Sequence, residues 1–127
     1  MTSAVLDASA VLALVFGEPG ADAVAERLPF GLLSAANYAE VLARSVERGR
    51  ELADATADIG LLRLSIWPFD AELAVIAASL RPTTKALGLS LADRACLALG
   101  IKTGFPVLTA DRKWLEASTG ADVRCIR

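Results

Sequence analysis

The sequence contains no histidine among its 127 residues. The usual Ser-His-Asp and Cys-His catalytic arrangements are therefore excluded, as are histidine acid–base pairs and histidine metal sites. Any chemistry must depend on carboxylates, hydroxyl groups, lysine, arginine or the one tyrosine, Tyr38.

Cysteine and long apolar runs are also scarce. Cys96 and Cys125 lie far apart in apolar segments, without CxxC or Cys/His spacing, so we expect two buried thiols in a reducing compartment. The apolar stretch at 10–17 has no basic segment before it and is too short to cross a bilayer. We therefore expect a cytoplasmic protein without a membrane partner.

Charge of either sign is nearly balanced, with a formal net charge of −2. This balance gives no sign of a basic nucleic-acid surface, although a bound divalent cation can supply positive charge locally. The length and the 54% hydrophobic content predict one compact domain spanning residues 1–127.

Short apolar runs alternate with helical patterns along the whole chain. Continuous apolar runs outnumber alternating ones, which is typical of a parallel sheet covered on both faces. The sequence predicts an α/β fold, a three-layer α/β/α domain with a central, mostly parallel sheet. We expect strands at 3–6, 30–34, 64–69, 105–109 and 121–126, helices at 7–17, 18–28, 35–49, 50–62, 71–80, 91–100 and 111–118, and a loop at 81–88.

Four acidic residues follow the predicted strands. Asp7 comes directly after the first strand, Glu40 lies in the helix after the second, Asp93 lies in the first turn of helix 91–100, and Asp111 follows the fourth strand. Ligands bind at the carboxyl ends of the strands in open parallel sheets, so these side chains can share one edge. Taken singly, each has a simpler explanation: Asp7 and Asp111 as helix caps, Asp93 as the partner of Ser90 in a capping box, and Glu40 as a solvated charge.

Carboxylates that converge at one place raise one another's pKa. A hard divalent cation such as Mg²⁺ or Mn²⁺ relieves that repulsion, because it takes oxygen ligands and is often held by carboxylates together with substrate phosphate. Carboxylates without histidine therefore favour metal-assisted phosphodiester hydrolysis.

Four segments together resemble the PIN-domain ribonucleases, and in particular the VapC-like toxins of toxin–antitoxin pairs. They are VLDASAVLAL, SAANYAEVLAR, LSLADRACLALG and PVLTADRKW, and the resemblance extends from residue 3 to about residue 126. It implies a Mg²⁺- or Mn²⁺-dependent endoribonuclease that hydrolyses RNA, with a cognate antitoxin as partner and a homodimer as its assembly.

The resemblance also implies roles for individual residues. Asp7, Glu40, Asp93 and Asp111 would be the catalytic acids, with Asp7 and Asp93 binding the metal directly and the other two acting through water or a second cation. Hydrogen bonds from Ser9, Asn37 and Thr109 would orient the carboxylates.

Two arginines and a helix pair are further candidates for binding. Arg94 and Arg112 neighbour the acids and are candidates for contacting RNA phosphate, although solvated charge or ion pairing explains them equally well. An antitoxin groove would be lined by the helices at 35–48 and 51–63. Its candidate apolar residues, which an intramolecular core explains as well, are Leu42, Val46, Leu52 and Ile59.

Two alternatives remain open at this point. One is a catalytically silent PIN-like module that binds RNA or acts as a scaffold. The other is a phospho-acceptor domain of the receiver type, because Asp70 follows a strand and Thr109 ends another. The second is less favoured, since Asp7 lacks an adjacent acidic partner and Asp70 is more simply an N-cap.

Overall fold

The structure, a computed structural model, describes residues 3–127. Its sheet has the strand order β3-β2-β1-β4-β5, and every neighbouring pair is parallel. The strands are β1 (Ala4–Leu6), β2 (Gly31–Ser34), β3 (Ser65–Trp67), β4 (Val107–Thr109) and β5 (Val123–Cys125). The predicted α/β architecture with a parallel central sheet is confirmed.

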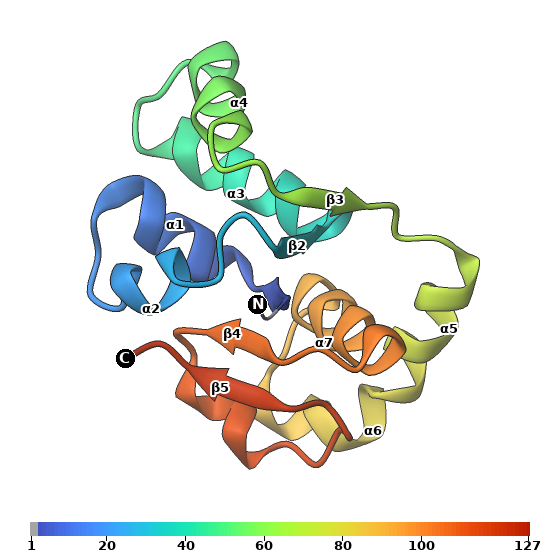
Figure 1. The fold of residues 1–127 in the computed structure, drawn as a ribbon. Coiled ribbons are helices and arrows are strands. Elements are labelled where there is room, and N and C mark those ends of the chain that lie inside the picture. The colour runs from blue at the N-terminus through green and yellow to red at the C-terminus, as the bar shows by residue number, and fades with distance from the viewer. Residues whose placement is uncertain (1–2) are drawn as a thin grey trace.

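Helices cover both faces of this sheet (Figure 1). The longest two, α3 and α7, begin at serine N-caps whose hydroxyl oxygens accept hydrogen bonds from the first turn. The α-helices are α1 (Ala8–Phe16), α2 (Ala21–Ala25), α3 (Ala35–Glu47), α4 (Leu52–Gly60), α5 (Ala71–Ser79), α6 (Arg81–Thr84) and α7 (Leu91–Thr103), and the 3₁₀ helices are η1 (Lys85–Leu87) and η2 (Arg112–Glu116).

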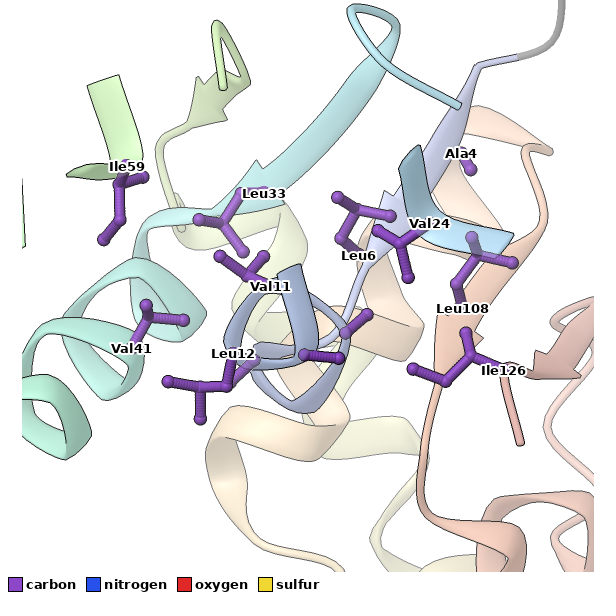
Figure 2. Close-up of a cluster of buried hydrophobic side chains, with 13 residues drawn as sticks. Ala4, Leu6, Val11, Leu12, Val24, Leu33, Val41, Ile59, Leu108 and Ile126 are labelled. Carbon is purple, nitrogen blue, oxygen red and sulfur yellow. The ribbon is translucent and has the colours of Figure 1, made fainter. Parts of the chain in front are cut away.

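Side chains alternate between two buried clusters along the central strands. Leu6 and Leu108 join a cluster with residues of α1 to α4, which Figure 2 shows. Val5 and Val107 face the opposite cluster, which is built largely from α5 and α7. Both faces of β1 and β4 are therefore buried, and the polar side chains at these strands lie at the strand ends.

The structure corrects several predicted elements. The helix expected at 18–28 is reduced to α2, because Gly20 adopts φ 95° and a side chain there would come within 2.7 Å of the Ile126 carbonyl oxygen. The segment predicted as a loop at 81–88 forms α6 and η1, and the helix expected at 111–118 is the 3₁₀ helix η2.

Two burial predictions need correction. The third strand lies at an edge of the sheet and is exposed at Ser65 and Ile66, so the sheet is not covered there. Cys96 is buried as expected, but Cys125 lies in the other edge strand, β5, and is only partly buried. Both thiols are free. Among residues 3–127, none of the helices has the length and apolarity needed to cross a membrane.

Candidate functional site

The topology brings the ends of β1 and β4 together. From β1 the chain continues outward through β2 and β3, and it then returns to place β4 and β5 on the other side of β1. The switch point of the sheet therefore lies between β1 and β4, which is where open parallel sheets bind their ligands. Asp7 follows β1, its N–H donates to the Leu108 carbonyl 2.9 Å away, and Asp111 follows β4.

A pocket of about 350 Å³ opens at this switch point. It contains all four acids singled out in the sequence, which come from four separate segments of the chain. The residues that line it are Asp7, Ala8, Ser9, Leu12, Glu40, Arg44, Ser90, Asp93 and Asp111.

Asp7 is the most enclosed of these acids, with 5% of its surface exposed. It occupies the N-cap position of α1, but its side chain makes no cap hydrogen bond. Instead, Oδ2 accepts hydrogen bonds from Ser9 Oγ at 2.7 Å and Thr109 Oγ1 at 2.8 Å. The simple capping explanation for Asp7 is therefore wrong, and two hydroxyl groups hold its carboxylate in place.

Burial raises the pKa of Asp7 from 3.8 to about 6. The hydrogen bonds from Ser9 and Thr109 oppose this rise, and the neighbouring charges of Asp93 and Glu40 add to it. At neutral pH the Asp7 carboxylate is therefore ionised, although its burial disfavours the charge.

Thr109 and Ser9 also fix the chain beyond β4. Thr109 Oγ1 accepts from the Asp111 N–H at 3.0 Å, and Ser9 Oγ accepts from the Ala110 N–H at 2.9 Å. One small hydroxyl network therefore positions both Asp7 and the backbone that carries Asp111.

Glu40 contributes an oxygen with unused hydrogen-bonding capacity. Its Oε1 is buried and has no hydrogen-bond partner among the described residues, while Oε2 lies 3.9 Å from Nη2 of Arg44. Burial raises the pKa of Glu40, the charge of Asp93 raises it further, and Asn37 and Arg44 partly offset the rise. An unpaired buried oxygen is costly unless something binds there, which makes it a good candidate to accept a hydrogen bond from a ligand or water.

Asn37 bridges two elements of the site. Its Nδ2 donates to the Ala92 carbonyl at 3.0 Å and so ties α3 to the first turn of α7. The contact sets the position of Asp93, which is the next residue on α7. Asn37 is thus placed to orient Asp93 through the backbone, and its side-chain amide also lowers the pKa of Glu40 by hydrogen bonding.

Asp93 has two structural roles at once. It forms the capping box with Ser90, in which Oδ2 accepts from the Ser90 N–H at 2.8 Å and Ser90 Oγ accepts from the Asp93 N–H at 3.1 Å. It also lines the pocket. Because α7 is buried from Ala95 to Gly100, its N-terminal turn is the part of the helix that can present a charge to a ligand.

Asp111 is more open than Asp7 and Glu40, with 37% of its side chain exposed. It N-caps η2, where Oδ1 accepts from the Lys113 N–H at 3.0 Å, and Oδ2 lies 4.0 Å from Lys113 Nζ. As with Asp93, the capping explanation is correct and the side chain still lines the pocket.

The two arginines suggested by the sequence are directed elsewhere. Arg94 Nη1 donates to the Ala77 carbonyl on α5 at 3.1 Å, and Arg112 Nη1 donates to the Arg127 carbonyl at 3.1 Å. Neither is among the described residues that line the pocket, whereas Arg44 is. Arg44 was missed because it does not adjoin an acid in sequence, although its position four residues after Glu40 on one helix puts both on the same face.

The donor set suits a hard cation held partly by water. All the charged ligands available are carboxylates, and Glu40 Oε1 lacks a partner within the described chain. No group of three or more acidic or cysteine side chains in residues 3–127 is arranged to hold a metal ion by itself. One or two carboxylates completed by water and substrate phosphate is a common arrangement for Mg²⁺, and these residues fit it.

The PIN domain family model matches residues 4–119, so the chain belongs to the PIN domain family. Comparison with curated proteins finds no match.

Solved structures share this fold over nearly the whole chain. DNA-bound VapBC from Salmonella typhimurium matches with a TM-score of 0.78 at 16% identity, covering 100% of both chains. VapBC2 from Rickettsia felis, bound to a fragment of promoter DNA, matches with 0.76 at 14% identity, covering 98% of both. VapBC-5 from Mycobacterium tuberculosis, a member of the VapBC family of toxin–antitoxin systems, matches with 0.67 at 21% identity, covering 100% of this chain and 99% of the other.

Proposed function

We propose that the protein is a Mg²⁺- or Mn²⁺-dependent endoribonuclease and the VapC-like toxin of a toxin–antitoxin pair. The observation that carries the proposal is the convergence of Asp7, Glu40, Asp93 and Asp111 on one pocket at the switch point of a PIN domain sheet. Capping explains the hydrogen bonds of Asp93 and Asp111, but it explains neither the side chain of Asp7 nor the presence of four acids in one pocket.

Asp7 and Asp93 would bind the cation directly. In both carboxylates the hydrogen bonds within residues 3–127 go to Oδ2, so Oδ1 of Asp7 and Oδ1 of Asp93 are free to bind a cation. Removing the charge repulsion around Asp7 would favour its ionised form, which the enclosure of the site otherwise disfavours. When bound, a divalent cation would neutralise charge on the phosphoryl group and acidify a water molecule.

Glu40 and Asp111 would act through metal-bound water or a second cation. Glu40 Oε1 is free to accept a proton from the attacking water, and the raised pKa of Glu40 suits a proton acceptor better than an ordinary carboxylate. Ser9 and Thr109 would keep Asp7 oriented throughout, since both hydroxyl groups donate to its Oδ2.

The proposed partners are an RNA substrate, a cognate antitoxin and a second copy of the chain. Structures of VapBC assemblies share the fold, which supports the antitoxin. Of the apolar residues suggested for a groove, Val46 and Leu52 are 46% and 57% exposed, whereas Ile59 is buried and Leu42 packs against the core. A second opening of about 450 Å³ lies between α1 and α4 and is lined by Val15, Phe16, Arg50, Asp58, Leu61 and Leu62.

The rival functions are less well supported. A silent RNA-binding module has no need for a buried carboxylate with a pKa raised to about 6. For a receiver-type domain, Asp70 would have to be a phospho-acceptor, but its Oδ1 accepts from the Leu73 N–H at 3.0 Å as the N-cap of α5, and the family match is to the PIN domain.

The test is cleavage of RNA by purified protein with Mn²⁺ or Mg²⁺. We expect cleavage by the unaltered protein, none with EDTA, and none by Asp7→Asn. Asp122→Asn is the matched control, because that acid is exposed and paired with Arg124 away from the pocket. Absence of cleavage above the Asp7→Asn background would favour the silent module.

A further inference from the structure

We propose that Arg44 binds a non-bridging phosphate oxygen of the RNA in the acidic pocket. This inference rests on the proposed nuclease function and adds a substrate-binding residue to it. Among the described residues that line the pocket, Arg44 is the one basic side chain.

The position of Arg44 follows from α3. It lies one helical turn beyond Glu40, so the two side chains share the face of α3 that is turned toward the pocket. With 56% of its side chain exposed, Arg44 stands at the open side of the pocket, while the Glu40 oxygen Oε1 is buried below it. A long, flexible guanidinium at the mouth is suited to meet a ligand that enters from solvent.

The charge of the pocket favours a basic residue at its entrance. Asp7, Glu40, Asp93 and Asp111 present four carboxylates to a ligand that is itself an anion. A single divalent cation cannot balance them, so an approaching phosphodiester still meets net negative charge. A guanidinium at the entrance lowers that repulsion and matches the geometry of two phosphate oxygens.

The present partner of Arg44 does not hold it firmly. Its Nη2 lies 3.9 Å from Glu40 Oε2, at the outer limit for an ion pair. By contrast, Arg50 makes three hydrogen bonds of 2.8–3.1 Å to Asp58. An exposed contact as long as that of Arg44 contributes little, so exchanging it for a phosphate costs little.

The neighbouring arginines are already engaged. Arg48, the C-cap residue of α3, pairs with Glu18 at 3.3 Å and stacks over Phe16 at 4.3 Å from the ring centroid. Arg94 and Arg112 donate to backbone carbonyls away from the pocket. Arg44 is therefore the arginine that can reach a bound phosphate without breaking a short contact.

The experiment measures RNA binding in a Glu40→Gln background, where the carboxylate partner of Arg44 is removed and cleavage is expected to be lost. The probe is a short fluorescein-labelled single-stranded RNA of mixed sequence, followed by fluorescence anisotropy in Mg²⁺ at several KCl concentrations. Arg44→Ala is compared with Arg44→Lys and with Arg81→Ala, which removes the same charge from an exposed position on α6.

We expect Arg44→Ala to weaken binding about tenfold or more, as loss of a charged hydrogen bond predicts. The slope of log affinity against log salt should fall in magnitude by about 0.7, the change for one phosphate contact on a single strand. The RNA affinity of Arg44→Lys should lie between those of Arg44→Ala and the Glu40→Gln protein. Arg81→Ala should bind RNA as tightly as the Glu40→Gln protein does. With Glu40 intact, Arg44→Ala should raise KM far more than it lowers kcat.

Two other outcomes overturn the inference. If Arg44 only positions Glu40, Arg44→Ala leaves the affinity and the salt slope unchanged in the Glu40→Gln background and lowers kcat alone. If any lost charge weakens binding equally, Arg81→Ala matches Arg44→Ala. If the protein with Glu40 intact binds RNA through Arg44 but does not cleave it, the nuclease proposal is refuted and the Arg44 contact stands.

Discussion

At the scale of single residues, Asp7 makes the clearest prediction. Its pKa is raised from 3.8 to about 6 in the fold, so the folded protein binds its proton more tightly than the unfolded chain. The associated stability, ~3 kcal/mol, is fully present below about pH 4 and is lost as pH rises through 6. Asp7→Asn removes this dependence, because an amide does not ionise and its oxygen can still accept hydrogen bonds from Ser9 and Thr109.

We therefore expect Asp7→Asn to raise the free energy of unfolding at neutral pH by ~1–3 kcal/mol, with a gain that disappears toward pH 4. Urea unfolding in EDTA at a series of pH values measures this. Asp122→Asn serves as control and should show no such gain, since that acid is exposed. Equal stability of Asp7→Asn and the parent protein at neutral pH would contradict the burial of an ionised Asp7.

Asp93 separates catalysis from folding. Asp93→Asn should abolish cleavage, since a proposed metal ligand is lost, and should change the free energy of unfolding by less than ~1 kcal/mol, because asparagine can still accept from the Ser90 N–H. The complementary variant Ser90→Ala removes the other half of the capping box and should cost ~1 kcal/mol while leaving the carboxylate. Cleavage assays beside chemical unfolding test both, and an active Asp93→Asn protein would refute the assignment.

The acids of the pocket could be selected from the sequence because each comes at the end of a strand or the start of a helix. Arg94 and Arg112 were selected only by adjacency to an acid. Successive residues point to different sides of a helix, and Arg94 accordingly reaches the Ala77 carbonyl. The spacing of four residues from Glu40 indicates that Arg44 lies on the same side of α3 as Glu40. It points to the pocket only once the structure shows which side of α3 faces the pocket.

At the scale of elements, Gly100 on α7 has the least room for a side chain among the described glycines, because it faces Val107 on β4. A Cβ placed on Gly100 would overlap Cγ2 of Val107, whose branched side chain has little freedom to move. Gly100→Ala should therefore destabilise the fold by ~1–3 kcal/mol, although alanine favours a helix by about 1 kcal/mol over glycine.

The matched control is Gly60→Ala on α4, where the described structure has nothing within 4 Å of a new Cβ. That substitution should stabilise by ~0.5–1 kcal/mol. In a Val107→Ala background the cost of Gly100→Ala should shrink, because the overlapping methyl group is gone. Urea unfolding of the unaltered protein, of Gly60→Ala, Gly100→Ala and Val107→Ala, and of the Gly100→Ala/Val107→Ala double variant gives the comparison. An unchanged cost of Gly100→Ala in the Val107→Ala background would show that Val107 is not the obstacle.

Element types were predictable where the apolar pattern is long, and less so at short or edge segments. The helix predicted at 91–100 is an example: residues 95–99 are all apolar, a pattern typical of a buried helix, and the structure buries them in α7. The helix predicted at 18–28 begins only at Ala21, because Gly20 has a positive φ and approaches Ile126, a residue at the far end of the sequence. Exposure of β3 depends on the strand order, which local sequence does not contain.

At the scale of the whole molecule, four acids that are distant in sequence share one pocket at the switch point of the sheet. There, β2 and β3 lie on one side of β1, and β4 and β5 lie on the other. Folding thus assembles the proposed cation site, and the unfolded chain lacks it. A ligand that binds only the folded state stabilises it by mass action, ~1.4 kcal/mol at ten times its dissociation constant. For a domain of this size that corresponds to a rise in Tm of about 3–6 °C.

We therefore expect millimolar Mg²⁺ or Mn²⁺ to raise Tm of the parent protein, measured by circular dichroism or calorimetry against EDTA. Asp7→Asn combined with Asp93→Asn should lose this rise, because both proposed direct ligands are gone, even though Asp7→Asn alone stabilises the metal-free protein. In the unaltered protein the buried charge of Asp7 destabilises the fold, and the cation relieves this destabilisation. In the double variant residue 7 carries no charge, so the cation has nothing to relieve. An equal rise in the double variant would place the cation elsewhere on the molecule and remove the basis for the nuclease site.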